Sequence, residues 1–354
     1  MKKITVLVVG LGNMGLSHAR AYQLIAEFEI VGLCSRGIDS RDDLKREFPN
    51  TPLFSDYEAA LAVLKPDAVS INTWPDTHAA YAKMAFAAGC HVFIEKPLAS
   101  TVQEAHQIAE LAKKANLKLV IGYILRVHPS WIKFVEVGKT LGKPLVMRMN
   151  LNQQSSGEQW QVHKHLMNSI SPIVDCGVHY VDVMCQVTGA KPVRVHAMGV
   201  RLTPEIDAKM YNYGQLQVSF DDGSVGWYEA GWGPMMSETA FFVKDMIGPK
   251  GSVSIAMEES KTSSSDVDSH TRTNALRIHH AKLNKHGRFA VADDIIHMTD
   301  EPGHQDLCNR EQEIFRDAIV HNLDLTAHVD DAINSLRIVL AADESIHTGQ
   351  VITL

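Results

Sequence analysis

The chain lacks several features that mark common classes of protein. Its 354 residues contain no apolar run long enough to span a bilayer, and no polybasic segment accompanies the formal net charge of −7. We therefore expect neither a membrane protein nor a nucleic-acid-binding one. The N-terminus, from Met1 to Lys3, runs directly into an expected strand and a glycine turn, without the small cleavage residues of a signal peptide. A cytoplasmic location is the resulting expectation.

Cysteine pairs and zinc-ligand motifs are also missing. Neither His163 with His165 nor His279 with His280 has the spacing of a helical zinc site, and no HExxH motif occurs, so we expect no metal. The cysteines are scattered and form no CxxC pair, which predicts reduced thiols that are mostly buried. They are Cys34, Cys90, Cys176, Cys185 and Cys308.

The composition that remains is that of an ordinary globular chain, 45% apolar and 21% charged, and it is long enough for two domains. In the first third, strand-like and helix-like segments alternate, which predicts a parallel sheet with helices on both faces. The expected strands are 4–9, 29–34, 67–73, 92–95 and 117–122. The expected helices include 78–88 and one ending at 115, which a capping box at 100–103 begins.

A glycine motif, Gly10-Leu11-Gly12-Asn13-Met14-Gly15, stands between the first strand and a helix. In this context Gly10 permits a tight turn, Gly12 lets the backbone approach a pyrophosphate, and Gly15 allows close helix–strand packing. The N–H groups at the helix N-terminus then hold the phosphates. A ligand-free glycine turn is the alternative, but the strand–turn–helix context favours a dinucleotide.

The end of the second strand bears on the choice of cofactor. An NAD-binding fold usually places an acidic residue there, bonded to the ribose 2′-OH. This chain has Ser35 and Arg36, and the nearest acid, Asp39, follows Gly37 in an expected loop. A hydroxyl and a guanidinium suit a 2′-phosphate, so we favour NADP over NAD. A solvated Arg36 is the alternative.

Ligands of such sheets bind beyond the carboxyl ends of the strands. Several side chains fall at or just after those ends, so we expect them to converge on one crevice. They are Thr73, Trp74, Pro75, His78, Glu95, Lys96, Tyr123 and Arg126.

After Gly122 the alternation stops, and we divide the chain into domains 1–123 and 124–354. The second domain is expected to be α+β, with a mainly antiparallel sheet and hairpin turns at 221–223 and 248–251. Its open face suits an oligomer interface if Trp227 and Trp232 lie there, although both tryptophans could equally be core residues. The expected strands are 145–151, 193–200, 214–220, 224–230, 239–247 and 252–255. Residues 258–273 form an expected loop, lid or disordered segment, and helices are expected at 311–321 and 330–347.

Ser171 and Pro172 are typical of a helix start. Asp175, His179 and Asp182 then follow on one helical face. The carboxylate of Asp175 is placed to orient His179 as an acid–base pair, although spacing alone favours a surface ion pair. Upstream, Trp160, His163 and His165 fall in an expected polar loop. They are either hydroxyl-binding residues or solvated ones.

These motifs together resemble the glucose–fructose oxidoreductase/inositol dehydrogenase (Gfo/Idh/MocA) family over essentially the whole chain. The matching pieces are the glycine motif, Glu95-Lys96-Pro97, Gly122-Tyr123 with Arg126 and Pro129, Asp175-x-Gly177-x-His179-x-x-Asp182, and the ending from Ala341 to Gly349. The chain departs from the commoner pattern at Ser35.

The resemblance implies a Rossmann domain followed by an open-faced sheet domain, assembled as a homodimer or homotetramer. It implies that Lys96 contacts the reacting hydroxyl and the nicotinamide ribose, that His179 is the proton acceptor and that Asp175 supports it. Either Lys96 or His179 could be the formal base, because coupled groups titrate together. The substrate would be a sugar, inositol or related polyol, with Tyr123, Arg126, Trp160 and His163 also near it. A cis Lys96–Pro97 bond is also expected.

Two alternatives remain open. One is a non-catalytic regulator that senses a nucleotide or sugar on the same fold, which loss of Lys96 or His179 would have favoured. The other is a reductase of a cyclic carbonyl compound.

Overall fold

A computed structural model describes residues 3–237, 243–256, 273–299 and 301–354. The chain divides into two compact units, of which unit 1 comprises residues 1–124 and 304–333, and unit 2 comprises residues 125–303 and 334–354. This grouping differs from a single cut after residue 123, because residues 304–333 return to the first unit.

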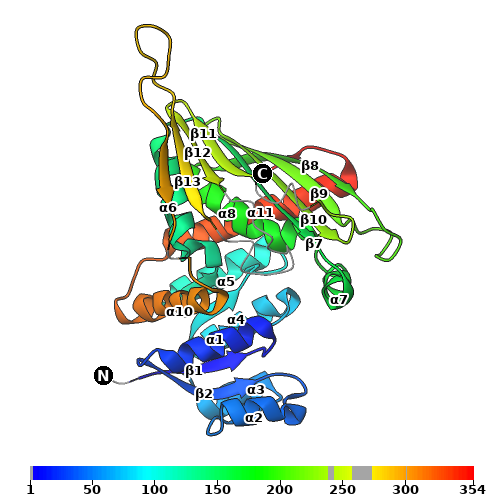
Figure 1. Cartoon of the computed structure of the whole chain (residues 1–354). Coiled ribbons are helices and arrows are strands. Elements are labelled where there is room, and N and C mark those ends of the chain that lie inside the picture. Colours follow the sequence, from blue (N-terminus) through cyan, green and yellow to red (C-terminus); the bar gives the residue numbers. More distant parts are fainter. Residues whose placement is uncertain (1–2, 238–242, 257–272, 300) are drawn as a thin grey trace. The chain divides into compact units, whose positions relative to one another are not determined.

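Unit 1 is built on a parallel sheet of six strands in the order β3-β2-β1-β4-β5-β6. Figure 1 labels β1 and β2 of this sheet. From β1 the strand order runs one way to β2 and β3 and the opposite way to β4, β5 and β6. This change in strand order beside β1 confirms the Rossmann fold expected from the alternating segments. The strands are β1 (Ile4–Val9), β2 (Phe28–Cys34), β3 (Leu53–Phe54), β4 (Ala68–Ile71), β5 (His91–Glu95) and β6 (Leu119–Gly122).

Helices pack on this sheet and close its core. Phe315 of α10 lies 6.0 Å from the ring of Phe28 and 6.1 Å from that of Phe93, so the returning segment completes the apolar cluster. The helices are α1 (Asn13–Leu24), α2 (Asp42–Glu47), α3 (Tyr57–Leu64), α4 (Pro75–Ala87), α5 (Val102–Ala115), α10 (His304–Val320) and the first part of α11 (Thr326–Thr348).

One helix start differs from the prediction. The N-cap of α5 is Thr101, whose hydroxyl accepts from the backbone N–H of Glu104, whereas the capping box was expected to begin at Ser100. The hydroxyl of Ser100 donates instead to the carbonyl of Pro75, which removes it as a cap.

Unit 2 contains a nine-stranded sheet in the order β14-β13-β12-β11-β7-β10-β9-β8-β15. Among the described strands of this second sheet, only the β7–β10 pair is parallel, which confirms a mainly antiparallel sheet. The strands are β7 (Val146–Gln154), β8 (Pro192–Val200), β9 (Tyr213–Phe220), β10 (Val225–Gly233), β11 (Lys244–Gly248), β12 (Gly251–Ala256), β13 (Ala275–His280), β14 (Asp294–His297) and β15 (Ile352–Thr353).

Two expected segments of this unit lie partly outside the described residues, and two observed strands were not predicted. Residues 239–242 of the expected strand 239–247 and nearly all of the expected loop 258–273 lie outside the described residues. The pair β13 and β14 was not predicted, since both strands carry charged or histidine side chains that mask the apolar alternation.

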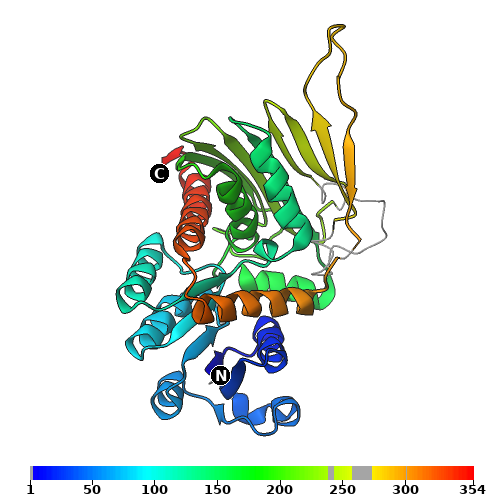
Figure 2. The ribbon, with the colours of Figure 1, turned by 90° about the vertical axis from the view of Figure 1, so that its left-hand side faces the viewer.

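The helices α6 (Pro129–Thr140), α8 (Pro172–Thr188) and α11 lie along one face of the sheet (Figure 2). Trp232 is 1% exposed and belongs to the core, while Trp227 is half-buried. The two tryptophans therefore have different environments.

The remaining helix, α7 (Gly157–Leu166), corrects the polar loop expected around Trp160 and His163. Only those two side chains of the helix are buried, so its apolar periodicity is too sparse to reveal it. All five cysteines are buried thiols, which confirms the expectation for them. Within the described residues, no helix combines the length and apolarity needed to cross a membrane.

Candidate active site

The glycine motif forms a tight turn between β1 and α1. Gly10 has a positive φ of 83°, and a Cβ there would lie 2.5 Å from the carbonyl oxygen of Asn72. A Cβ at Gly15 would lie 1.8 Å from the carbonyl oxygen of Gly10, so only glycine permits this packing. By contrast, a Cβ at Gly12 would meet nothing within 4 Å.

Gly12 is also the N-cap of α1 and contributes no side-chain hydrogen bond, and Asn13 and Met14 follow it in the first turn. This open helix N-terminus suits the pyrophosphate of a dinucleotide. The turn therefore has the form that a dinucleotide cofactor requires.

The end of β2 lies beside this turn. Ser35 is half-buried and Arg36 is exposed. Sequence reasoning missed Arg41, whose guanidinium donates to the carbonyl of Leu11 in the glycine motif at 3.1 Å and also pairs with Asp43 at 2.7 Å. No local pattern marks Arg41, because its contact with the turn spans thirty positions.

The β4–α4 turn holds the next set of expected residues. Trp74 is 44% exposed, and Pro75 opens α4 beside the Thr73 hydroxyl, which bonds to that of Thr77 at 2.6 Å. His78 differs from these because it is completely buried.

Both ring nitrogens of His78 lie against backbone carbonyls, Nδ1 at 2.8 Å from Pro97 and Nε2 at 3.0 Å from Thr73. A neutral imidazole donates to only one of two acceptors. Desolvation nevertheless lowers the pKa of His78 and so favours that neutral form. The ring thus joins two turns, and its direct contact with a cofactor stays a prediction.

Lys96 follows β5 directly and is half-buried. Its backbone N–H donates to Oε2 of Glu95 at 3.2 Å, and Oε1 of Glu95 lies 2.7 Å from Nε2 of His18. The Lys96–Pro97 bond is cis, which confirms that expectation. Glu95 therefore turns into the core and anchors the turn that carries Lys96.

Tyr123 follows β6 and is only 2% exposed. Its ring meets that of His328 edge-on with centroids 6.5 Å apart, and Nε2 of His328 accepts from the backbone N–H of Ile121 at 2.9 Å. The contact places Tyr123 inside unit 1. A substrate contact by Tyr123 stays a prediction.

In unit 2, α8 begins at the expected place. The Ser171 hydroxyl accepts from the backbone N–H of Val174 at 3.1 Å and donates to Oδ1 of Asp343 at 2.8 Å. The hydroxyl of Tyr211 donates to the same oxygen. Burial raises the pKa of Asp343, and these two donors oppose that rise. A three-residue network therefore holds the N-terminus of α8.

Asp175 and His179 lie one turn apart on α8, and both side chains are half-buried. They are thus neither solvated surface groups nor sealed core groups. The acid–base role of this pair stays a prediction. Gly177 lies between them, and a Cβ there would come within 3.1 Å of Tyr228.

Arg126, which was expected near the substrate, forms a bidentate pair with Asp182. Nε and Nη2 of Arg126 donate to the two carboxylate oxygens of Asp182 at 2.7 and 2.6 Å. The Asp182 side chain is 1% exposed, and its burial raises its pKa while the Arg126 guanidinium opposes that rise. The expected role of Arg126 in binding substrate is therefore accompanied by an observed role in fixing α8.

The His163 side chain of α7 is buried, and Nδ1 lies 2.9 Å from the Ser155 hydroxyl. Its ring stacks on that of Trp232 at 4.7 Å, and the Trp232 indole donates to Oε1 of Gln153 at 2.6 Å. The Cys176 thiol lies 3.5 Å from the same oxygen. This chain of contacts links α7 to α8 through β10 and β7, and sequence reasoning missed Gln153.

Trp160 lies on the same helix as His163 and is 6% exposed. The ammonium of Lys164 lies 5.5 Å from the centre of its ring. Trp160 therefore packs within unit 2, and any contact with substrate stays a prediction.

A buried lysine also lies close to α8. Lys244 of β11 is 4% exposed, and its ammonium lies 5.8 Å from the centre of the Tyr180 ring. Desolvation lowers the pKa of Lys244 to about 7. In the sequence Lys244 is one lysine within an expected strand, so no pattern predicted that its side chain would be buried.

Within unit 1 the structure brings the glycine turn, the β4–α4 turn and the Lys96 turn to the carboxyl ends of adjacent strands β1, β4 and β5. Within unit 2 it joins Arg126, α7 and the α8 residues into connected contacts. Each unit thus assembles its own share of the expected site residues.

Comparison with known protein families gives two matches. Residues 4–123 match the model of an oxidoreductase family with an NAD-binding Rossmann fold. Residues 136–253 match the model of the GFO/IDH/MocA C-terminal domain. The two matches follow each other along the chain as the two parts of one protein type.

Individual relatives agree with these matches. The UDP-N-acetylglucosamine 3-dehydrogenase of Acidithiobacillus ferrooxidans is 33% identical over 54% of this chain, and the match spans only 57% of that relative's length. The scyllo-inositol 2-dehydrogenase (NAD(+)) of Bacillus subtilis is 25% identical over 83% of this chain and 90% of its own.

A solved structure shows the same fold. The scyllo-inositol dehydrogenase of Lactobacillus casei, with bound NAD(H) and scyllo-inositol, has a TM-score of 0.77 and 22% identity. The comparison covers 99% of both chains.

Proposed function

Because this chain belongs to the Gfo/Idh/MocA family of oxidoreductases, we propose that it is an NAD(P)-dependent dehydrogenase of a sugar, inositol or related polyol. The observation that carries the proposal is the Lys96 turn, which follows the parallel strand β5 and is anchored by Glu95. The glycine turn, built to admit a dinucleotide, supports it from the same sheet edge.

The proposed chemistry assigns one task to each residue type. The glycine turn would hold a dinucleotide, whose nicotinamide would accept the hydride that leaves the carbinol carbon. The Lys96 ammonium stabilises the developing alkoxide, and His179 takes the hydroxyl proton. Asp175, one turn earlier on α8, stabilises the imidazolium that His179 then becomes. In this scheme the formal base is His179.

We infer that NADP is used in preference to NAD. Ser35 and Arg36 at the end of β2 suit a 2′-phosphate, and the guanidinium of Arg41 supports this because it reaches the glycine motif. One relative carries NAD(+) in its name, so the cofactor ratio is a direct test.

The first experiment follows cofactor reduction across inositols, hexoses and nucleotide sugars, with NAD and NADP in parallel. Turnover of one polyol supports the proposal. Tight cofactor binding without turnover of any alcohol or cyclic carbonyl would support a sensor instead, and turnover of carbonyls alone would support the reductase.

The cofactor choice is tested with Arg36→Asp, for which the exposed Arg46→Asp is the matched control. Arg36→Asp is expected to lower kcat/KM for NADP by about tenfold or more, since it replaces a cation at a phosphate with an anion. Unchanged preference in that variant, or NAD preference in the unmodified chain, would contradict the NADP proposal.

We further propose that the chain forms a homodimer or homotetramer through the uncovered face of its nine-stranded sheet. Supporting this, Val146, Val225 and Met198 are 41%, 44% and 58% exposed there. Val146 and Val225 are paired across β7 and β10, and they line one groove with His196 and Trp227. Apolar side chains gathered on one sheet face are typical of an interface.

A further inference from the structure

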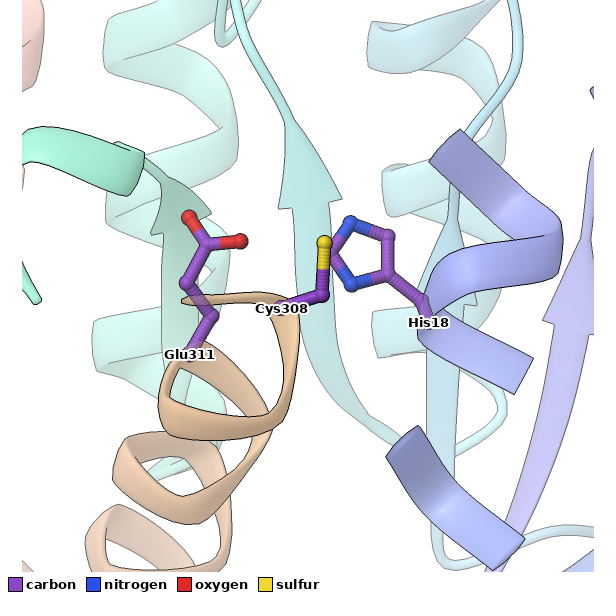
Figure 3. A group of neighbouring side chains, drawn as sticks. All are labelled: His18, Cys308 and Glu311. Carbon is purple, nitrogen blue, oxygen red and sulfur yellow. The ribbon is translucent and has the colours of Figure 1, made fainter. Parts of the chain in front are cut away.

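A compact group of potential ligands lies in unit 1, outside the residues assigned to the reaction. His18 comes from α1, and Cys308 and Glu311 lie one turn apart on α10 (Figure 3). One ligand atom from each residue lies within 4.8 Å of the other two. All three are buried, with at most 4% of any side chain exposed.

The carboxyl group of Glu311 is the unusual member. Both of its oxygens are buried, and neither has a hydrogen-bond partner. A carboxylate buried in this way is strongly destabilised unless a proton or a cation neutralises it. The group therefore needs a positive partner that the surrounding side chains do not give it by hydrogen bonding.

His18 is held in the tautomer of a ligand. Its Nε2 lies 2.7 Å from Oε1 of Glu95, a carboxylate, and therefore carries the proton. Its Nδ1 lies 2.8 Å from the side-chain amide nitrogen of Gln312 and presents a lone pair. Metal-bound histidines usually donate their second ring N–H to a carboxylate in this way.

We propose that His18, Cys308 and Glu311 bind one divalent transition-metal ion, for which zinc is the best fit. A thiolate sulfur, an imidazole nitrogen and a carboxylate oxygen form a ligand set that zinc accepts. The thiolate and the carboxylate together balance the two positive charges. Zinc displaces one proton from Cys308 and one from Glu311, and the Gln312 amide turns away from Nδ1.

The geometry needs only a small contraction. Bonds of about 2.0 to 2.3 Å put the ligand atoms of a tetrahedral zinc about 3.5 Å apart, so the cluster closes by about 1 Å from its present maximum of 4.8 Å. His304 lies one turn before Cys308 on α10, and its Nε2 is 3.6 Å from the Cys308 sulfur. This nitrogen offers a fourth ligand.

The site would be structural. It would tie α10, the segment that returns to unit 1 late in the chain, to α1 behind the glycine turn. Because Glu95 accepts from the Nε2–H of His18 and also from the backbone N–H of Lys96, the ion would strengthen the support of the Lys96 turn.

The test measures metal and does not depend on any catalytic turnover. The whole protein, produced with added zinc and purified without chelator, is expected to contain about one zinc per chain by elemental analysis. Refolding with Co(II) is expected to give the ultraviolet charge-transfer absorption of a cobalt–thiolate bond. Cys308→Ser should remove that absorption, while Cys90→Ser, which alters another buried thiol of unit 1, should retain it.

Glu311→Gln is a second variant, for use if Cys308→Ser fails to fold. It keeps the shape of the side chain and removes its charge. Its zinc affinity is expected to fall about 10- to 100-fold, and a chelator should lower Tm in the unmodified protein but not in this variant. Absence of zinc and of the cobalt–thiolate absorption in the folded unmodified protein would overturn the proposal. Equal zinc binding by Glu311→Gln would overturn the assignment of Glu311.

Discussion

At the scale of single residues, burial decides what each candidate side chain does. Lys96 and Lys244 are both lysines that follow or begin strands, yet Lys96 is half-buried and Lys244 is 4% exposed. Water still reaches part of Lys96, whereas Lys244 is enclosed beside the Tyr180 ring. The two positions therefore lead to different predictions, one kinetic and one thermodynamic.

Lys96→Ala is expected to lower kcat by about 100-fold or more, because a charge that stabilises the alkoxide acts mainly in the transition state. Cofactor affinity should change far less, since the glycine turn and the β2 end are untouched. Stopped-flow turnover and a cofactor titration measure the two effects, with the exposed Lys113→Ala as control. Retained turnover in Lys96→Ala would refute the role assigned to it.

Lys244→Met is expected to stabilise the protein in a pH-dependent way. The folded-state pKa of Lys244 is about 7 and its usual value is 10.5, so the unfolded chain holds a proton that the folded one lacks between those pH values. The destabilisation by Lys244 is therefore complete below pH 7 and fades as pH rises toward 10.5.

Denaturation of Lys244→Met at pH 6.5 should show a gain on the order of 3 kcal/mol, which shrinks at alkaline pH. The exposed Lys250→Met is the control and should show no such trend. A gain that is the same at every pH would mean that packing, not charge burial, causes it.

At the scale of elements, α8 is fixed from several sides. Ser171 and Asp343 hold its N-terminus, Arg126 binds Asp182 farther along it, and Gln153 contacts Cys176 on its first turns. A half-buried acid–base pair needs such support, because geometry at a reacting atom tolerates little movement. The partners Asp343, Arg126 and Gln153 come from three different parts of the chain, so tertiary contacts fix the position of α8.

Breaking the Arg126–Asp182 pair by Arg126→Met is expected to destabilise the protein by about 3 to 5 kcal/mol, since it leaves a buried carboxylate without its cation. Arg148→Met is the matched control, because its partner Asp245 belongs to a more exposed pair, and it should cost about 0 to 1 kcal/mol.

Chemical denaturation measures both variants, and adding Asp182→Asn to Arg126→Met should recover part of the loss. If the two single arginine variants were equally stable, the pair would have no special role in holding α8.

The sequence predicted the features that depend on neighbouring residues and missed those that depend on residues far apart in the chain. The glycine motif and the Ser171–Pro172 helix start are encoded within a few residues, so local patterns revealed both. The pairing of His18 with Gln312 joins positions almost three hundred residues apart, and no local pattern marks it. The helix α7 is an intermediate example. Its His163 ring stacks on Trp232, and no pattern in the sequence indicated that these two residues are partners.

At the scale of the whole molecule, the nine-stranded sheet presents apolar side chains on the face opposite its helices. Val225→Glu places a charge on that face, at the start of β10, and is expected to shift the protein toward the monomer. Light scattering after gel filtration measures the change. The control is Val63→Glu, at a position 70% exposed on α3 of unit 1, which should keep the native assembly. A monomeric unmodified protein would contradict the proposed interface.

The late return of the chain to unit 1 has a consequence for synthesis. Phe315 completes the apolar cluster around Phe28 and Phe93, yet residues 125–303 leave the ribosome before it does. During translation, part of the core of the Rossmann sheet therefore stays exposed to water until most of the protein has been synthesised. An expression fragment that stops near residue 124 would lack Phe315 permanently. Its apolar cluster would remain exposed, and we expect chaperones to bind it.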